Sequence, residues 1–313
     1  MQNNQMRRIC CGGEAFAHYK KTGRSQQGMA IWKDQAFLFY HGGACDVMNL
    51  KTGEIVHHFR LDSYTGDGSA PDVNHANQAL FGGTPEMGQQ YPLLYVTAGN
   101  AAGYDSDGYY GRCIVEQISF DESVGTFRSR RVQTICFQDD AEKRDESGCY
   151  AAPALHPFEP PCWGWPSFLP DAEHGRMLIF SARYRTKLRE YDDVNRYIIT
   201  AFRLPQAEDG AWVTLRPADI LDQFEADYDI GATQGGMVYQ DKIYYTFGFG
   251  RADFPDGMRV FDLKKRRLIT AVDLSHSIFA QEEIESCGVY QGQLLCNTNR
   301  GGLYSLGKAE EFA

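Results

Sequence analysis

The side chains best suited to chemistry lie where short predicted strands begin. Glu285 and His75 are the candidates for acid/base catalysis, because one is a carboxylate and the other titrates near neutral pH. Amides and indole rings suit carbohydrates, which need hydrogen bonds to their hydroxyls and a flat surface against their C–H faces. We predict a ligand pocket lined by Gln27, His41, Asn74, His75, Asn77, Trp163, Trp165, Gln234, Arg251 and Arg300.

Two further interpretations of these residues stay open. Polar residues of this kind also hold water molecules or cap strand ends without binding any ligand. Arg251 and Arg300, with Arg183 and Arg185, fall in predicted loops, and converging guanidinium groups would favour an anionic ligand. The sequence therefore predicts a polar pocket without deciding the charge of its ligand.

Motifs for metals, nucleotides and covalent catalysis are not found in the sequence. It contains no HExxH or CxxC pattern, no P-loop and no serine nucleophile elbow. His75 and His41, together with a loop aspartate, could still form a metal site from distant positions. We predict that the protein has no metal site and no cofactor.

Aromatic-rich runs over residues 36–40, 92–96, 177–180 and 242–246 would position these side chains. Each run is short, apolar and bounded by turn residues, which is typical of buried β-strands. Residues 217–224 have the clearest helical pattern, since a proline opens the segment and an aspartate lies in its first turn. The fold class predicted for the chain is all-β.

A repeat of about 45 residues organises the strands. Residues 28–39, 236–245 and 287–296 align as a strand, a tight turn and a second strand. Residues 47–56 and 260–269 align as a third strand, a turn and a fourth. Four-stranded units of this length are typical of the blades of a β-propeller.

Five such units predict a single-domain, five-bladed β-propeller over residues 1–313. A strand around residues 15–21 would complete the last unit and close the ring, which leaves no free sheet edge. Six blades are the alternative if residues 1–27 or 138–163 contain further strands. The predicted units span residues 28–61, 77–137, 164–216, 234–274 and 285–306.

The third strand of the repeat reads as two apolar residues, Asp or Asn, Leu, Lys, any residue and Gly. This pattern resembles the repeats of YVTN-type and quinoprotein-like β-propellers, and units one and four carry it best. Quinoprotein enzymes have periodic tryptophan-docking motifs, whereas this chain has four tryptophans without such a period. The resemblance therefore implies the propeller fold but not the quinoprotein cofactor.

In a propeller, the loops between blades and those joining second to third strands meet on one face, where ligands usually bind. Five-bladed propeller glycosidases place their acids near the starts of inner strands, and Glu285 matches such a position. Gln27, Asn77 and Gln234 are amides at the other positions. Because glycosidases need two carboxyl groups, the similarity to them is limited.

Composition and net charge restrict the classes of binding partner and the cellular compartment that we expect for this protein. A net charge of −10 argues against nucleic acids and anionic membranes, because the basic patches at residues 128–131 and 264–267 are short and we expect them to be solvated faces. No apolar run is long enough for a transmembrane helix.

The nine cysteines form no dense framework, so we expect reduced thiols, with Cys149–Cys162 as the best disulfide candidate. No apolar stretch follows Arg7 and Arg8, which predicts a cytoplasmic protein, or a periplasmic or secreted one if a leader was removed.

The function that we expect is that of a ligand-binding propeller with a polar and aromatic funnel along its axis, with a saccharide as a candidate small-molecule ligand. The first alternative is a hydrolase or lyase that acts on a glycan through the same funnel, using Glu285 and His75. The second alternative is a scaffold for protein interactions, which needs a large apolar patch on a rim or face. The oligomeric state stays open.

Overall fold

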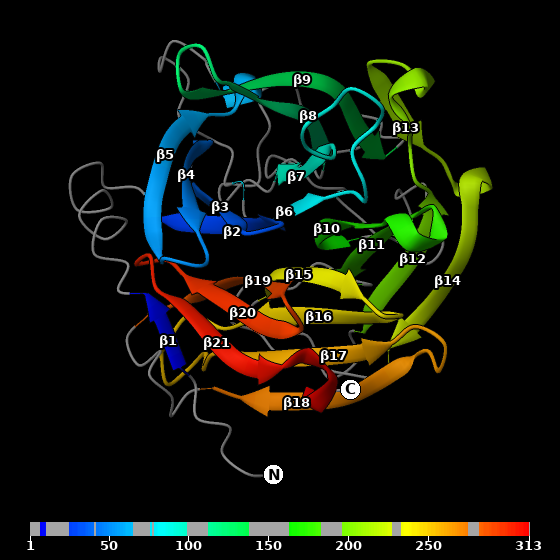
Figure 1. The fold of residues 1–313 in the computed structure, drawn as a ribbon. Coiled ribbons are helices and arrows are strands. Elements are labelled where there is room, and N and C mark those ends of the chain that lie inside the picture. The colour runs from blue at the N-terminus through cyan, green and yellow to red at the C-terminus, as the bar shows by residue number, and fades with distance from the viewer. Residues whose placement is uncertain are drawn as a thin grey trace.

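The computed structural model describes residues 7–10, 25–40, 42–64, 76, 78–98, 112–137, 163–182, 196–226, 233–274 and 282–312. Five mainly antiparallel sheets are arranged around a central axis (Figure 1). In each sheet the first strand lies at the axis and later strands follow outward. The all-β, five-bladed propeller predicted from the repeats is therefore confirmed.

The blades are numbered here in chain order, and most have four strands. The first and second blades contain β2 (Gln26–Trp32), β3 (Gln35–Tyr40), β4 (Ala44–Asn49) and β5 (Glu54–Arg60), and β6 (Gln78–Phe81), β7 (Leu94–Ala98), β8 (Arg112–Asp121) and β9 (Thr126–Phe137), respectively. The third and fourth contain β10 (Trp163–Asp171), β11 (Arg176–Ala182), β12 (Tyr197–Arg203) and β14 (Ile220–Ala226), and β15 (Thr233–Tyr239), β16 (Lys242–Phe247), β17 (Gly257–Asp262) and β18 (Arg267–Asp273), respectively. The fifth contains β19 (Ile284–Tyr290), β20 (Gln293–Thr298) and β21 (Leu303–Lys308).

Inner and outer strands differ in burial because neighbouring blades cover both faces of the inner ones. In β3 every residue from 36 to 40 is buried, and β17 is buried at every position. In the outer strand β5, exposed residues alternate with half-buried ones. The inner strands therefore appear in the sequence as continuous apolar and aromatic runs, whereas the outer strands do not.

Aromatic rings fill the seams between blades. Phe37 contacts Phe81 and Phe127 of the second blade edge to face, with ring centroids 5.2 and 5.5 Å apart. Between the third and fourth blades, Phe180 stacks on Tyr245 with centroids 4.1 Å apart. Each such pair adds about 0.5–1.5 kcal/mol beyond the burial of its area. These seams hold the inner strands in a fixed relation to one another.

Five cysteines in the described ranges are free and buried, which agrees with the expectation of reduced core thiols. Burial raises the pKa of Cys287 to about 12, so this thiol stays protonated and unreactive. The Cys149–Cys162 candidate disulfide lies outside the described residues. The free thiols belong to Cys45, Cys113, Cys136, Cys287 and Cys296.

An N-terminal strand closes the ring, as predicted, but at a different place in the chain. The strand β1 (Arg7–Cys10) pairs antiparallel with β21 as the outermost strand of the fifth blade. In Figure 1 these two strands lie side by side. The prediction for residues 15–21 falls outside the described residues. An outermost strand needs little apolar surface, which is why its position carries only a weak signal in the sequence.

The predicted helix over residues 217–224 is wrong. Only η6 (Pro217–Asp219) forms a single 3₁₀ turn, where the Asp219 carboxylate accepts a hydrogen bond from the Arg216 backbone N–H at 3.0 Å. The chain then continues as β14, which pairs with β12. The proline and aspartate therefore start a turn, and pairing with the third blade keeps the following residues extended.

The predicted end of the third unit at residue 216 is also wrong, because β14 extends this blade to residue 226. The segment before it, β13 (Trp212–Leu215), leaves the third blade and pairs in parallel with β9 of the second. The second blade consequently has five strands. The pairing of β13 with β9 connects the second and third blades at the outer edge of the propeller.

The helical segments of the described ranges are short 3₁₀ turns. None of the helices in these ranges is long and apolar enough to cross a membrane. The remaining turns are η1 (Asp62–Tyr64), η4 (Ala172–His174), η5 (Ala207–Asp209) and η7 (Ala309–Phe312).

Candidate functional site

Several inner strands begin with a β-bulge. The register between first and second strands shifts between Gln26 and Met29 in β2, and equivalent shifts occur near the starts of β10, β15 and β19. A bulge inserts extra residues and re-aims side chains, and bulges are frequent next to functional sites. Gln27, Gln234 and Glu285, all predicted site residues, lie within the bulges of β2, β15 and β19.

Glu285 links the fifth blade to the first. β19 lies between β15 and β2 at the axis (Figure 1). The Gln27 side-chain amide donates a hydrogen bond of 3.1 Å to Oε1 of Glu285, whose side chain is buried. Burial, followed by the nearby carboxyl groups of Glu283 and Asp256, raises the pKa of Glu285 well above its ordinary value. The raised pKa favours the protonated form of Glu285, in which the carboxyl group can donate as well as accept hydrogen bonds.

Gln234 connects the fourth blade to the fifth. Its side-chain amide donates to the Gly248 carbonyl and to Glu283 Oε1, both at 2.7 Å. Asn299 donates to the second oxygen of Glu283 at 3.1 Å. Burial raises the pKa of Glu283, while these two amides and the charge of Arg251 counteract part of the shift.

Asp256 is a further carboxyl group of this region that the sequence analysis did not identify. Its side chain is buried, and Oδ1 accepts a hydrogen bond from the Gly250 backbone N–H at 2.8 Å. Burial is the main cause that raises the pKa of Asp256 to about 7, and the charges of Glu283 and Glu282 add to it. Its position in the glycine-rich loop between β16 and β17 was the signal that could have identified it.

Gln27, Gln234, Asp256, Glu283 and Glu285 form what we call the strand-start cluster. Arg251 is the cation whose charge acts on this cluster, but it is half exposed and pairs with Asp253 at 3.2 Å. It therefore does not neutralise the three carboxyl groups of the cluster. Such a group of buried acids with raised pKa values is frequent at functional sites. Within the described ranges, no three His, Cys, Asp or Glu side chains are grouped so that they could hold a metal ion.

Gln78 crosses the axis. It starts the inner strand of the second blade, yet its side-chain amide donates to the Gly236 carbonyl of the fourth blade, which is not its neighbour in the ring. In return the Gly236 backbone N–H donates to Gln78 Oε1 at 2.6 Å. A Cβ atom on the neighbouring Gly235 would lie 2.9 Å from Gln78 Oε1, so glycine at that position allows this close approach.

The other predicted site residues are placed only in part. Arg251 and Arg300 are exposed in loops of the same face, and the charge of Arg251 acts on Glu283. Trp163 and Trp165 lie in β10, but their side chains are outside the description. The residues that lie outside the described ranges altogether are His41, Asn74, His75 and Asn77.

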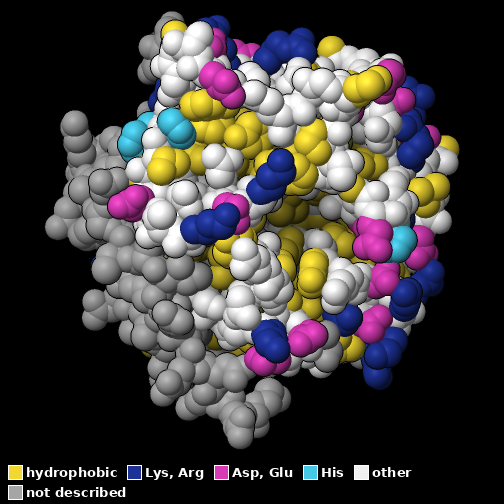
Figure 2. All heavy atoms as spheres, viewed as in Figure 1, with side chains coloured by type: hydrophobic (Ala, Val, Ile, Leu, Met, Phe, Trp, Pro, Cys, Tyr) yellow, Lys and Arg dark blue, Asp and Glu magenta, His cyan; other side chains and the backbone are white. Residues whose placement is uncertain are grey.

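A shallow groove of about 240 Å³ lies at the opposite end of the fourth and fifth blades, which we call the hairpin end. β15 and β19 have seven residues each, so their two ends are about 20 Å apart. Figure 2 shows the face that carries η4 and η7, where charged side chains surround a central hollow with hydrophobic walls. The groove shares no residue with the strand-start cluster; it is lined by Tyr239, Gln240, Gln291, Gly292, Gln293, Lys308, Ala309 and Glu310.

Comparisons with known proteins reach only the level of the fold. No protein-family model and no curated protein sequence matches the chain. The crystal structure of glutaminyl cyclase from Myxococcus xanthus is similar, with 10% identity, a TM-score of 0.45 and coverage of 90% of this chain and 89% of that one. Raptor from Chaetomium thermophilum matches with 12% identity and a TM-score of 0.38, over 88% of this chain and 19% of its own length.

Proposed function

We propose that this propeller binds a small ligand rich in hydroxyl groups, such as a saccharide, at the strand-start cluster. The observation that carries the proposal is the repeated bulge, which places Gln27, Gln234 and Glu285 at the same level of three consecutive blades. A bulge interrupts the ladder of hydrogen bonds and re-aims side chains, and bulges are frequent next to functional sites.

The chemistry of the cluster suits hydroxyl groups. A hydroxyl both donates and accepts hydrogen bonds, and so do a carboxamide and a protonated carboxyl group. Gln27 and Gln234 supply carboxamides, and the raised pKa of Glu285 favours the protonated form of its carboxyl group. The cluster can therefore match a neutral polyol without introducing an unpaired charge.

Access to the cluster is from its outer edge. Gln27 and Gln234 each keep 7% of their surface exposed, whereas Glu285 keeps 1%. The ligand would contact the two amides directly and Glu285 through Gln27. Arg251 and Arg300 lie in exposed loops of this face and would favour a carboxylate substituent, as in a uronic acid.

The experiment is a thermal-shift screen of the full chain against neutral monosaccharides, oligosaccharides and uronates. A ligand that binds only the folded state raises the melting temperature, and the stabilisation grows with the logarithm of one plus the ratio of ligand concentration to Kd. In Gln27→Ala and Gln234→Ala the shift should fall by more than about half, each measured against its own ligand-free melting temperature. Gln291→Ala, at the hairpin end, is the matched control and should keep the full shift.

Two results would reject the proposal. In one, no saccharide or uronate changes the melting temperature of the wild-type protein. In the other, a ligand does so, but the two strand-start variants retain the full shift.

A second candidate function is a glycan hydrolase or lyase that uses the same cluster. The observation in its favour is that two carboxyl groups of the cluster have raised pKa values, because burial raises that of Asp256 to about 7 and that of Glu285 well above its ordinary value. A carboxyl group with a raised pKa can act as a general acid near neutral pH. Turnover of aryl glycosides or polyuronates that Glu285→Gln abolishes, while binding persists, would establish the enzyme.

A scaffold function has less in its favour among the residues that the structure describes. The large apolar side chains exposed there do not gather on one face. They belong to outer strands and turns of different blades, namely Val56, Met87, Val124, Trp212 and Leu221.

A further inference from the structure

The two carboxamides of the strand-start cluster use their N–H groups inside the protein. Gln234 Nε2 donates to the Gly248 carbonyl and to Glu283 Oε1, both at 2.7 Å, so both of its hydrogens are occupied. Because a backbone carbonyl can only accept, this contact fixes which end of the Gln234 carboxamide faces inward. Gln27 Nε2 likewise donates to Glu285 Oε1 at 3.1 Å. The groups that these amides leave for a ligand are mainly their oxygen atoms.

These oxygen atoms are acceptors without a donor. Among the described residues, no hydrogen bond reaches Oε1 of Gln27 or Oε1 of Gln234. Ser286, in the bulge of β19, is fully buried, and its Oγ has no hydrogen-bond partner within the same ranges. A Cβ atom on Gly235 would lie 3.0 Å from this Oγ, so the hydroxyl lies beside the residue that follows Gln234. Buried polar atoms that stay unpaired cost stability, which a ligand with several donors would restore.

Negative charge is also uncompensated at this end. Burial is the main cause of the raised pKa values of Asp256 and Glu285, and the charge of Glu283 adds to both. The nearby cation, Arg251, is half exposed and pairs with Asp253 at 3.2 Å. A positive charge placed among the three carboxyl groups would therefore reduce their mutual repulsion.

We propose that the strand-start cluster binds its ligand through a protonated primary amine, as carried by an amino sugar. An ammonium group offers three N–H donors and no acceptor, which complements the free oxygens of Gln27 and Gln234. Its charge is matched by the adjacent carboxyl groups, and charge-assisted hydrogen bonds are the stronger kind. The inference rests on the proposed function for the place of the site, and it narrows the ligand from any hydroxyl-rich molecule to one with a cationic nitrogen.

The other ligand groups fit this arrangement less well. A hydroxyl donates one hydrogen bond and carries no charge, so it can satisfy an amide oxygen but leaves the carboxyl groups uncompensated. A carboxylate only accepts, and its charge is repelled by Glu283 and Asp256. The exposed loop residues Arg251 and Arg300 are the groups that would favour it. Affinity should therefore decrease from an amino sugar to a neutral sugar and then to a uronate.

The experiment measures thermal shifts of the full chain at neutral pH with glucosamine, N-acetylglucosamine, glucose, glucuronate and ethanolamine. N-acetylation removes the charge of glucosamine and keeps its ring, whereas ethanolamine keeps an amine and lacks the ring. Sodium chloride at equal ionic strength corrects for screening by the charged compounds. From the concentration dependence of the shift, glucosamine should bind at least about tenfold more tightly than N-acetylglucosamine or glucose.

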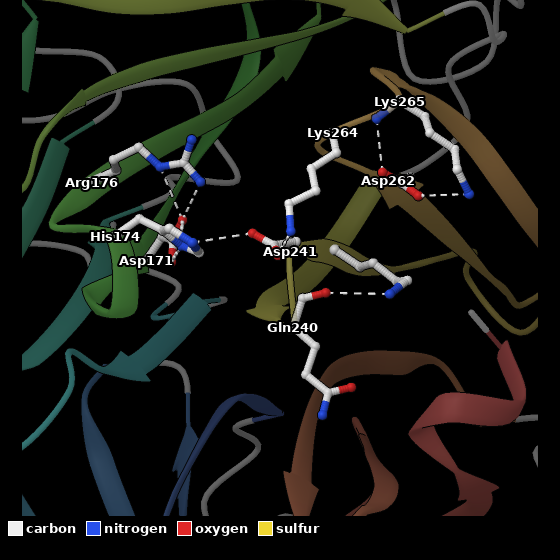
Figure 3. Close-up of polar contacts among 9 residues, drawn as sticks. Asp171, His174, Arg176, Gln240, Asp241, Asp262, Lys264 and Lys265 are labelled. Carbon is white, nitrogen blue, oxygen red and sulfur yellow. Dashed lines mark hydrogen bonds and ion pairs between the residues drawn. The ribbon is translucent and has the colours of Figure 1, made fainter.

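A pair of matched variants assigns the effect to the cluster. Asp256→Asn removes one carboxyl group and keeps an oxygen that can accept from the Gly250 backbone N–H. It should lose more than about half of the shift by glucosamine, measured against its own ligand-free melting temperature. Asp262→Asn is the control at the hairpin end, where the carboxylate already accepts from the Lys265 backbone N–H at 2.8 Å (Figure 3). This variant should keep the full shift.

The outcomes separate the inference from the proposed function. If glucose, N-acetylglucosamine or glucuronate binds as tightly as glucosamine, the amine is not recognised, and the saccharide site stands without it. Equal binding of ethanolamine and glucosamine would support the amine and reject the saccharide. Absence of any shift in the wild type would reject both, and this comparison needs no variant to fold. A full glucosamine shift in Asp256→Asn would also overturn the inference.

Discussion

The two ends of the fourth blade treat acidic residues in opposite ways. At the strand-start end, the buried carboxyl group of Asp256 and the half-buried one of Glu283 have raised pKa values. At the hairpin end, Asp241 and Asp262 have lowered pKa values, because Lys264 and the backbone and side chain of Lys265 donate to them (Figure 3). Compensated charges of the second kind mainly support the fold and its solubility, whereas uncompensated buried acids are characteristic of sites.

Hydrogen-bond donors explain why the same residue type behaves differently at the two ends. Asp241 and Asp262 at the hairpin end accept hydrogen bonds from Lys264 and Lys265, which stabilise the charged form although Asp262 is itself buried. A carboxylate in the strand-start cluster lies among amides and other acids, where desolvation disfavours the charge and protonation relieves it. The contribution of the strand-start end to stability should therefore depend on buried hydrogen bonds. The contribution of the hairpin end should depend on ion pairs that salt can screen.

The largest expected effect is that of Gln78→Ala. This change leaves the backbone N–H and carbonyl of Gly236 without the partner that crosses the axis. The loss of unfolding free energy should be about 2–5 kcal/mol, measured by urea denaturation. Gln240→Ala at the hairpin end should change it by less than about 0.5 kcal/mol. Equal losses in the two variants would contradict the contrast between the ends.

The next effect is the pH dependence of Asp256→Asn. Because the pKa of Asp256 is about 7 when folded and 3.8 ordinarily, the folded state holds a proton that the unfolded chain has released. Wild-type stability should therefore fall as the pH rises from about 4 to about 7. The asparagine oxygen can still accept from Gly250, so the variant should be more stable at pH 8 by about 1–3 kcal/mol and no different near pH 4.

Asp262→Asn is the control with the opposite sign. The backbone N–H of Lys265 is the main cause of its lowered pKa, so the folded state favours the ionised form. This contribution to stability is present above the ordinary pKa and is lost as the pH falls through the folded one. The variant should thus be less stable than wild type at neutral pH. If both asparagine variants shift in one direction, the two ends do not differ as described.

The smallest effect is expected for Lys264→Met. The Lys264 side chain is largely exposed, and its ion pair with Asp241 is open to solvent. Its melting temperature should fall slightly in low salt and match the wild type at about 1 M salt, where the Debye length is near 3 Å. A loss that persists in high salt would show that the pair acts through packing rather than charge.

The sequence predicted those parts of the fold whose signal is local. Inner strands are buried on both faces, so residues 36–40 and 242–246 appear as apolar runs and lie in β3 and β16. The outer strand β14 was mistaken for a helix, because its polar and half-buried pattern is decided by pairing with β12. Local propensity yields to tertiary contacts at such edges.

The candidate site was predicted only as far as each blade could be aligned with the others. Alignment placed Gln27, Gln234 and Glu285 at equivalent positions, and the structure brings them to one end. Their partners follow from packing: Gln27 meets Glu285 across 258 positions of sequence. Glu283 and Asp256 join through contacts between blades, which no spacing within one repeat encodes.

Because β1 pairs with β21, the fifth blade is completed only after β21 has been synthesised. Arg7 is synthesised 298 residues before its partner Ser305. At ordinary rates of translation the interval between them is on the order of tens of seconds. During that time the growing chain holds an open arc of blades, with the edges of its inner strands uncovered. The propeller is therefore most exposed to mispairing before β21 emerges, because β21 pairs with β1 and completes the fifth blade beside the first.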